Sequence, residues 1–204
     1  MSETHPSEVN HHGDHPGFSG LTGTLFAAVF LLAGRAGAAL AAELTEPGPD
    51  DHVVDVGCGP GNAVRAAARR GARATGVDPS TAMLRVARVV TRDGNVTWSQ
   101  GSAEALPVAD AAATLVWALA TVHHWRDVPS GLAEIRRVLA PGGRLLAVER
   151  QTRPGATGYA SHGWTTQQAE SFADLCRSAG FVDVEVTTRQ TGRRAVWAVS
   201  ARRA

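Results

Sequence analysis

Residues 53–61 read Val-Val-Asp-Val-Gly-Cys-Gly-Pro-Gly, an apolar run that ends in three glycines placed at every second position. The apolar run indicates a short buried strand, and the glycines indicate a tight turn into a helix. Glycine is used where a backbone turns sharply or where another group approaches it closely. This stretch therefore predicts a strand, a glycine loop and a helix, with a ligand that touches the loop backbone.

Strand and helix signals alternate along the rest of the chain. After the first strand, short apolar or β-branched runs indicate strands at 73–78, 95–101, 112–120 and 143–150. Helical patterns lie between or after them, at 62–72, 80–94, 130–143 and 166–180. The last two runs, 181–189 and 193–203, are joined by a short turn around Gly192 and indicate a hairpin. The sequence predicts an α/β fold, with a mostly parallel sheet, helices on both faces and a C-terminal antiparallel hairpin.

Composition limits the function classes. The 204 residues fit one domain, and the net charge of +1 gives no electrostatic reason to expect nucleic acid as a partner. Two distant cysteines, Cys58 and Cys176, form no CxxC pattern, which favours a reducing compartment such as the cytoplasm.

The polar residues 1–17 predict a flexible tail before a single domain at 18–204. The tail holds four histidines but no cysteine and no rigid spacing, so we expect no metal site.

Residues 18–44 are strongly apolar and lie between the tail and the first strand. No Lys or Arg precedes Arg35, so the positively charged start of a signal peptide is missing. Arg35 also lies in the middle of the stretch, which argues against a membrane span and against stable membrane insertion. We predict a helical lid over the site, with breaks near Gly34 and Gly37.

The glycine spacing indicates what kind of ligand the loop holds. The nicotinamide fingerprint is G-x-G-x-x-G/A, but Gly57, Gly59 and Gly61 give G-x-G-x-G, which suits a ligand without a pyrophosphate. Asp78 ends the second strand, 21 residues after Gly57. An acid at this point of such folds accepts hydrogen bonds from the hydroxyls of a ribose. The residues therefore predict a ribose site without a diphosphate site.

From about residue 50 to the end, the chain resembles the class I S-adenosylmethionine-dependent methyltransferases, and most of all the small-molecule group that includes the quinone-biosynthesis C-methyltransferases. The motifs VVDVGCGPG, GVDPSTAML, GSAEALP, TVHHWRD and EIRRVLAPGGRL occur in the family's order. The resemblance implies a Rossmann-like seven-stranded sheet with one antiparallel strand, S-adenosyl-L-methionine as cofactor, and a small molecule as methyl acceptor. The cofactor-binding residues that it implies are Asp55, Gly57, Cys58, Gly59, Gly61, Asp78, Pro79, Met83, Ser102, Ala103 and Ala118.

Two positions depart from the family pattern. Ser102 replaces an acid that accepts from the adenine amino group, and a hydroxyl forms a weaker bond there than a carboxylate. Thr114 replaces the acid that usually opens the fourth strand, at a position that supports structure. Glu104, in the same motif as Ser102, is expected to be a solvated or loop-bonding acid.

The candidate catalytic residues are His123 and His124, which follow the fourth strand at the edge where open α/β sheets bind ligands. One of them is expected to deprotonate or position the acceptor, and the alternative is that one caps the loop and the other packs near the cofactor. Three tryptophans are candidates for either an apolar acceptor wall or the core: Trp117, Trp125 and Trp164.

Two other functions stay open at this point. One is a cofactor-binding module without catalysis, and the other, disfavoured by the glycine spacing and the hairpin, is a Rossmann oxidoreductase. The sequence identifies neither the acceptor nor the oligomeric state.

Overall fold

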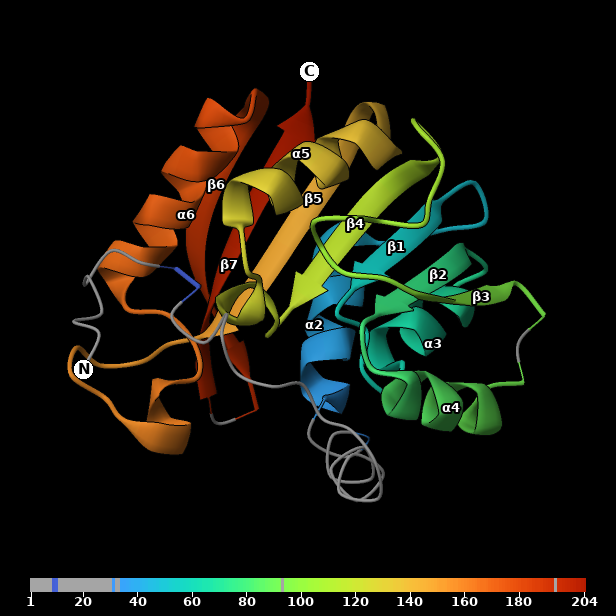
Figure 1. The fold of residues 1–204 in the computed structure, drawn as a ribbon, viewed down its shortest axis with the longest axis horizontal. Coiled ribbons are helices and arrows are strands. Elements are labelled where there is room, and N and C mark those ends of the chain that lie inside the picture. Colours follow the sequence, from blue (N-terminus) through green and yellow to red (C-terminus); the bar gives the residue numbers. More distant parts are fainter. Residues whose placement is uncertain (1–8, 11–30, 32–33, 93, 193) are drawn as a thin grey trace.

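The computed structural model describes residues 9–10, 31, 34–92, 94–192 and 194–204. Seven strands form one sheet in the order β3-β2-β1-β4-β5-β7-β6 (Figure 1). The strands are β1 (His52–Val56), β2 (Arg73–Asp78), β3 (Val96–Gln100), β4 (Ala113–Leu119), β5 (Leu139–Arg150), β6 (Phe181–Thr191) and β7 (Arg194–Arg203). Only β7 runs antiparallel to its neighbours, β5 and β6. The predicted mostly parallel sheet with a C-terminal antiparallel hairpin is confirmed.

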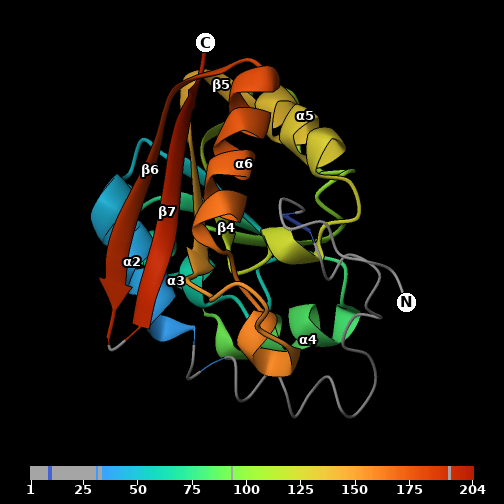
Figure 2. The ribbon, with the colours of Figure 1, turned by 90° about the vertical axis from the view of Figure 1, so that its left-hand side faces the viewer.

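Five α-helices of the described chain cover the two faces of this sheet. They are α2 (Arg35–Thr45), α3 (Asn62–Ala68), α4 (Thr81–Val90), α5 (Val128–Val138) and α6 (Thr166–Ser178). Helices α2 and α3 lie on one side of the sheet and α5 and α6 on the other (Figure 2). In the described chain, no helix combines the length and the apolar character that crossing a bilayer requires.

The core has two parts because neighbouring residues of each strand point to opposite faces. In β4, Val116 and Ala118 join the cluster under α5 and α6, while Leu115 and Trp117 join the cluster under α2 and α3. These four side chains have no exposed surface. Strands covered on both faces in this way have the continuous apolar pattern seen in the sequence.

The boundary between α5 and β5 differs from the prediction. The helix pattern at 130–143 indicated a later end, but α5 ends at Val138 and β5 begins at Leu139. Leu139 pairs with Ala113, and the register then shifts at a bulge before Leu115 pairs with Arg144. Gly142 has a φ of +76°, which lets the bulged segment turn within the strand.

The segments before β1 are described only in part. Val9 is buried and its carbonyl accepts from the Trp164 indole at 2.9 Å, so this point of the predicted tail packs on the core. Helix α2, the described part of the predicted lid, begins after Gly34 and runs through Gly37 without a break, so the break predicted near Gly37 is wrong. The remaining residues of 1–17, with the four tail histidines, and residues 18–30 and 32–33 lie outside the described residues.

The strand order determines where a ligand can bind. From β1 the chain continues outward to β2 and β3, then returns to place β4 on the other side of β1. The connections after β1 and β4 therefore leave the sheet in opposite directions and open a crevice at their carboxyl ends. The glycine loop follows β1, and the short helix η1 (Val122–His124) follows β4, so both lie at this crevice.

Candidate active site

The glycine loop is fixed to the end of the neighbouring strand. The amides of Gly57 and Cys58 both donate to the Val77 carbonyl of β2, at 2.8 and 3.0 Å. Gly57, Gly59 and Gly61 have φ values of +71°, +52° and +81°, in the left-handed region that favours glycine. The loop is thus a defined backbone structure that positions its amides without a ligand.

The three glycines make room for different groups. A Cβ at Gly57 would collide with the side chain of Thr121, and one at Gly61 would collide with the ring of Trp98. A Cβ at Gly59 would meet no atom within 4 Å. Two of the glycines therefore serve the protein's own packing, and Gly59 is the one that leaves open space over the loop.

Asp78 lies directly beside that open space. Its carboxylate accepts from the amide of Gly59 and from the amide of Ser80, each at 2.8 Å and each through a different oxygen. A carboxylate offers about four lone-pair sites, so each oxygen keeps capacity for one more donor. Burial raises the pKa of Asp78 above its usual range, against the opposing effect of the two amide hydrogen bonds. An open glycine and a carboxylate with spare acceptor capacity fit a ribosyl ligand such as S-adenosylmethionine.

Asp55 adds a second buried carboxyl group below the loop. Its side chain is 3% exposed, and burial, followed by the charge of Asp78, raises the pKa of Asp55 to about 8. The carboxyl group is therefore mostly protonated at neutral pH in the ligand-free protein. A cationic ligand would favour its ionised form.

The other cofactor residues implied by the family resemblance flank this region. Pro79 is exposed, whereas Met83, Ala103 and Ala118 are buried. Cys58 is also buried, which raises the pKa of its thiol well above the usual value and makes the thiolate a minor form. The assignment of these residues to the cofactor stays a prediction.

Ser102 and Glu104 form a local support for the loop after β3. The Glu104 carboxylate accepts from the amides of Arg126 and Asp127, at 2.8 and 3.3 Å. Burial acts to raise the pKa of Glu104, but hydrogen bonds from its own backbone, from the Ser102 hydroxyl and from these amides lower it below its usual range. The expectation that Glu104 is a loop-bonding acid is confirmed.

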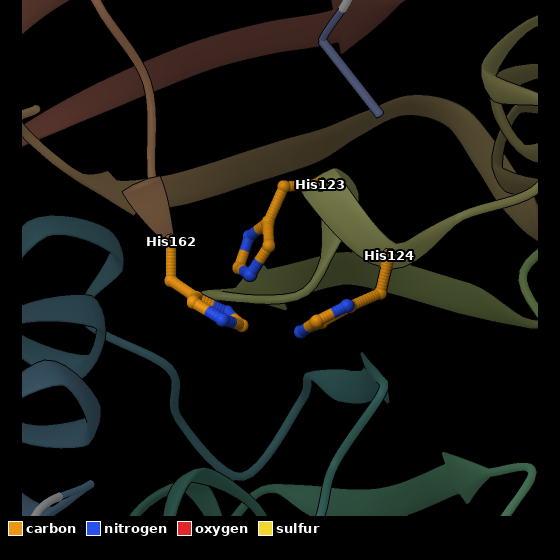
Figure 3. A group of neighbouring side chains, drawn as sticks. All are labelled: His123, His124 and His162. Atoms are coloured by element: carbon orange, nitrogen blue, oxygen red, sulfur yellow. The ribbon is translucent and has the colours of Figure 1, made fainter. Parts of the chain in front are cut away.

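His123 and His124 lie in η1, next to the loop. Thr121, whose side chain fills the space over Gly57, directly precedes this short helix. His123 is 3% exposed and its Nδ1 lies 2.9 Å from the Glu149 carboxylate, while His124 is exposed. The structure brings a third histidine, His162, from the segment after η2 (Gly158–Ser161) to within 5.5 Å of both rings, centroid to centroid (Figure 3).

The three tryptophans belong to the core. Trp117 and Trp164 have no exposed surface, and Trp125 is 4% exposed. Trp164 packs on Phe172 with ring centroids 4.8 Å apart. The core interpretation is confirmed for all three, and the acceptor-wall interpretation is wrong.

Sequence reasoning missed four residues of this region: Glu149, His162, Thr121 and Trp98. Glu149 is the second-to-last residue of β5, which pairs with β4, so the rule that carboxyl ends of parallel strands meet at one edge would have indicated it. His162 lies in an irregular segment, which has no periodicity from which a position can be inferred. Thr114, as expected, supports structure, because its hydroxyl donates to Asp51 at 2.6 Å and accepts from the His52 amide.

Comparisons with known proteins agree with this geometry. Residues 54–147 match the family model described as a methyltransferase domain. The ubiquinone/menaquinone biosynthesis C-methyltransferase of Rubrivivax gelatinosus is 36% identical over 109 residues, which are 53% of this chain and 43% of that protein. The chain spans less than half the length of the curated relatives it matches.

Solved structures share the fold over most of the chain. An S-adenosylmethionine-dependent methyltransferase from Mesorhizobium loti matches with a TM-score of 0.69 and 23% identity, over 84% of this chain and all of that one. The [4+2]-cyclase SpnF matches with a TM-score of 0.69 and 21% identity, over 97% of this chain and 88% of that one. At these identities the likeness concerns the fold alone.

Proposed function

Because residues 54–147 match the model of a methyltransferase domain, we propose that the chain is a class I S-adenosylmethionine-dependent methyltransferase that transfers a methyl group to a small-molecule acceptor. The observation that carries this proposal is the open space over Gly59 beside the Asp78 carboxylate, at the same sheet edge as His123 and His124. A binding site for the cofactor and polar side chains for an acceptor thus lie next to each other.

The cofactor supplies a methyl group that is already activated on a sulfonium, so the protein mainly has to hold the acceptor in line with it and exclude water. Asp78, beside the open space over Gly59, accepts hydrogen bonds from the ribose hydroxyls. The histidine pair contacts the acceptor and orients its nucleophilic atom. Orientation of this kind supplies several kcal/mol, and up to about 7–11 in the best intramolecular reactions.

The acceptor is a small molecule, and we place the reaction in the cytoplasm. Cys58 and Cys176 are both free and buried, as expected for a protein in a reducing compartment. The net charge of +1 gives no electrostatic reason to expect a nucleic-acid substrate.

A screen of phenols, quinols, carboxylic acids and amines for release of S-adenosylhomocysteine tests the proposal. We expect release with at least one class and none with Asp78→Ala, whose affinity for the cofactor should fall at least tenfold because two hydrogen bonds to a charged group are lost. Asp174→Ala is the matched control, since Asp174 is an exposed acid on α6.

Two results would contradict the proposal in different ways. Cofactor binding in calorimetry without release for any acceptor would favour a binding module, or another reaction on this fold, as in the matched cyclase. Absence of cofactor binding would remove the methyltransferase assignment itself.

A further inference from the structure

Three histidines from two separate segments converge at the acceptor side of the site. One ring nitrogen each of His123, His124 and His162 lies within 4.8 Å of the other two. The ring centroids of His123 and His124 are 4.0 Å apart, and both rings lie about 5.5 Å from His162. In Figure 3 the three rings point toward a common space. The three side chains thus offer one nitrogen ligand each to a common space.

A buried carboxylate orients the first of these rings. Glu149 has no exposed surface, and one of its oxygens lies 2.9 Å from Nδ1 of His123. Its other oxygen accepts from the amides of Val122 and His123, at 2.9 and 3.5 Å. Because an ionised carboxylate only accepts, Nδ1 carries a proton, and a neutral ring then presents Nε2 as the basic nitrogen. Metal-binding histidines are oriented by a carboxylate in this way.

The charges around Glu149 also favour a cation. A buried carboxylate is costly unless a positive group compensates it. Among the described residues, His123 is the only ion-pair partner of Glu149. A metal ion bound by the three imidazoles would add a positive charge next to this buried carboxylate.

We propose that His123, His124 and His162 bind one divalent transition-metal ion of the zinc type, with Glu149 as the orienting carboxylate. Imidazole suits Zn²⁺, Cu²⁺, Fe²⁺ and Ni²⁺, whereas Mg²⁺ prefers oxygen ligands. Three protein ligands leave a position for water or substrate, as in catalytic zinc sites. At a zinc–nitrogen distance of about 2.0–2.1 Å, tetrahedral ligands lie roughly 3.4 Å apart, so the widest pair must close by about 1.4 Å. His124 is exposed and His162 half-buried, so their side chains can make this movement.

The role of the ion rests on the proposed function. The ion lies at the same sheet edge as the glycine loop, since Thr121 connects that loop to η1. An acceptor hydroxyl held by the ion loses its proton to solvent more readily, because a bound cation lowers the pKa of its ligands. The oxygen, or a carbon conjugated to it, then forms a bond to the methyl carbon. The carbon–sulfur bond breaks with its electron pair on sulfur, which gives the neutral thioether and a methylated acceptor.

Metal binding is measured directly on the full chain after chelator treatment, by calorimetry with Zn²⁺ and by the visible spectrum on Co²⁺ addition. We expect one tight equivalent with the tetrahedral Co²⁺ spectrum and no comparable binding of Mg²⁺. His162→Ala should weaken this binding at least tenfold. Glu149→Gln should weaken it about 10–100-fold, as for other residues that orient metal ligands.

The histidines of residues 1–17 require a control, because they too can bind metal ions. The double variant His11→Ala/His12→Ala should keep the tight equivalent and the Co²⁺ spectrum. If this variant loses the tight site while His162→Ala retains it, or if no tight equivalent is found, the proposal is wrong. Circular dichroism checks that each variant is folded. If the Glu149→Gln variant does not fold, His124→Ala is measured in its place. His124 is exposed, so this substitution should leave the fold intact.

Binding of S-adenosylhomocysteine to the metal-free protein separates this proposal from the proposed function. Cofactor binding without metal binding overturns the metal site and leaves the methyltransferase assignment intact. Metal binding without cofactor binding overturns the methyltransferase assignment and leaves the metal site intact. If both bind, the metal-free protein should form S-adenosylhomocysteine from S-adenosylmethionine and the acceptor at least tenfold more slowly than the zinc-bound protein. Adding Zn²⁺ should restore the rate. An unchanged rate would overturn the catalytic role of the ion.

Discussion

Gly59 and Gly142 share a local conformation but differ in their surroundings. Both have positive φ values, of +52° and +76°, and a Cβ on either would meet no atom within 4 Å. Gly142 lies in the bulged start of β5, at the amino end of that strand, whereas Gly59 lies at the carboxyl edge of the sheet beside Asp78. A substitution at Gly142 therefore introduces backbone strain alone, whereas the same substitution at Gly59 introduces the strain and also fills the proposed ligand space.

Gly59→Ala should lower the affinity for S-adenosylhomocysteine at least tenfold in calorimetry, because the methyl group enters the space that we assign to the cofactor. Gly142→Ala should leave that affinity unchanged. Both variants should lose about 1–2 kcal/mol of unfolding free energy from the left-handed backbone. Equal cofactor affinity in the two variants would place the cofactor elsewhere.

Asp55 should make the stability of the ligand-free protein depend on pH. Burial, and then Asp78, raises the pKa of Asp55 to about 8, against about 3.9 in an unfolded chain. Between these values the folded protein holds a proton that the unfolded chain releases, so the free energy of unfolding falls as pH rises. Urea unfolding between about pH 5.5 and 8 should show a smaller fall for Asp55→Asn than for the wild type. Parallel curves would mean that Asp55 is ionised in the folded protein.

At the level of elements, helix α2 and the residues before it are expected to behave differently. Ala38, Leu40, Ala41 and Ala42 are buried in the cluster with α3, and the Arg144 guanidinium donates to the Thr45 carbonyl at 2.9 Å. We therefore expect α2 to stay packed on the core whether or not the cofactor is bound. The rest of the predicted lid at 18–44 lies outside the described residues, except for residues 31 and 34.

Hydrogen exchange with and without S-adenosylhomocysteine tests this division. Residues 35–45 should be protected to the same extent in both states, because their packing does not involve the cofactor. Residues 18–33 should gain protection when the ligand is added, as expected of a segment that closes over the site. Equal exchange of residues 18–33 in the two states would contradict the lid.

For the whole molecule, cofactor binding should appear as thermal stabilisation. A ligand at about 100 times its Kd adds about 2.7 kcal/mol to the unfolding free energy. For a chain of this size, each kcal/mol raises the Tm by about 2–4 °C, so S-adenosylhomocysteine should raise it by about 5–11 °C. NADH should give no shift at the same concentration. A shift with NADH alone would favour the oxidoreductase alternative instead.

The sequence by itself determined the order and the type of the elements, and the position of the glycine loop and Asp78. These features depend on local patterns: apolar runs, helical spacing, and glycines at fixed distances from a strand. The main error in element boundaries concerns the start of β5, which was predicted at residue 143 but lies at Leu139. The strand begins earlier because Leu139 pairs with Ala113 of β4. Local propensity carries no information about such a partner.

Only the tertiary structure decided what surrounds the site. It showed that the Thr121 side chain occupies the space over Gly57 and the Trp98 ring the space over Gly61, whereas the space over Gly59 is open. It also showed that Glu149 and His162 lie beside the histidine pair and that the three tryptophans are buried in the core. The physical reason is that contacts between residues far apart in the chain depend on strand order and packing, which one-dimensional spacing does not specify.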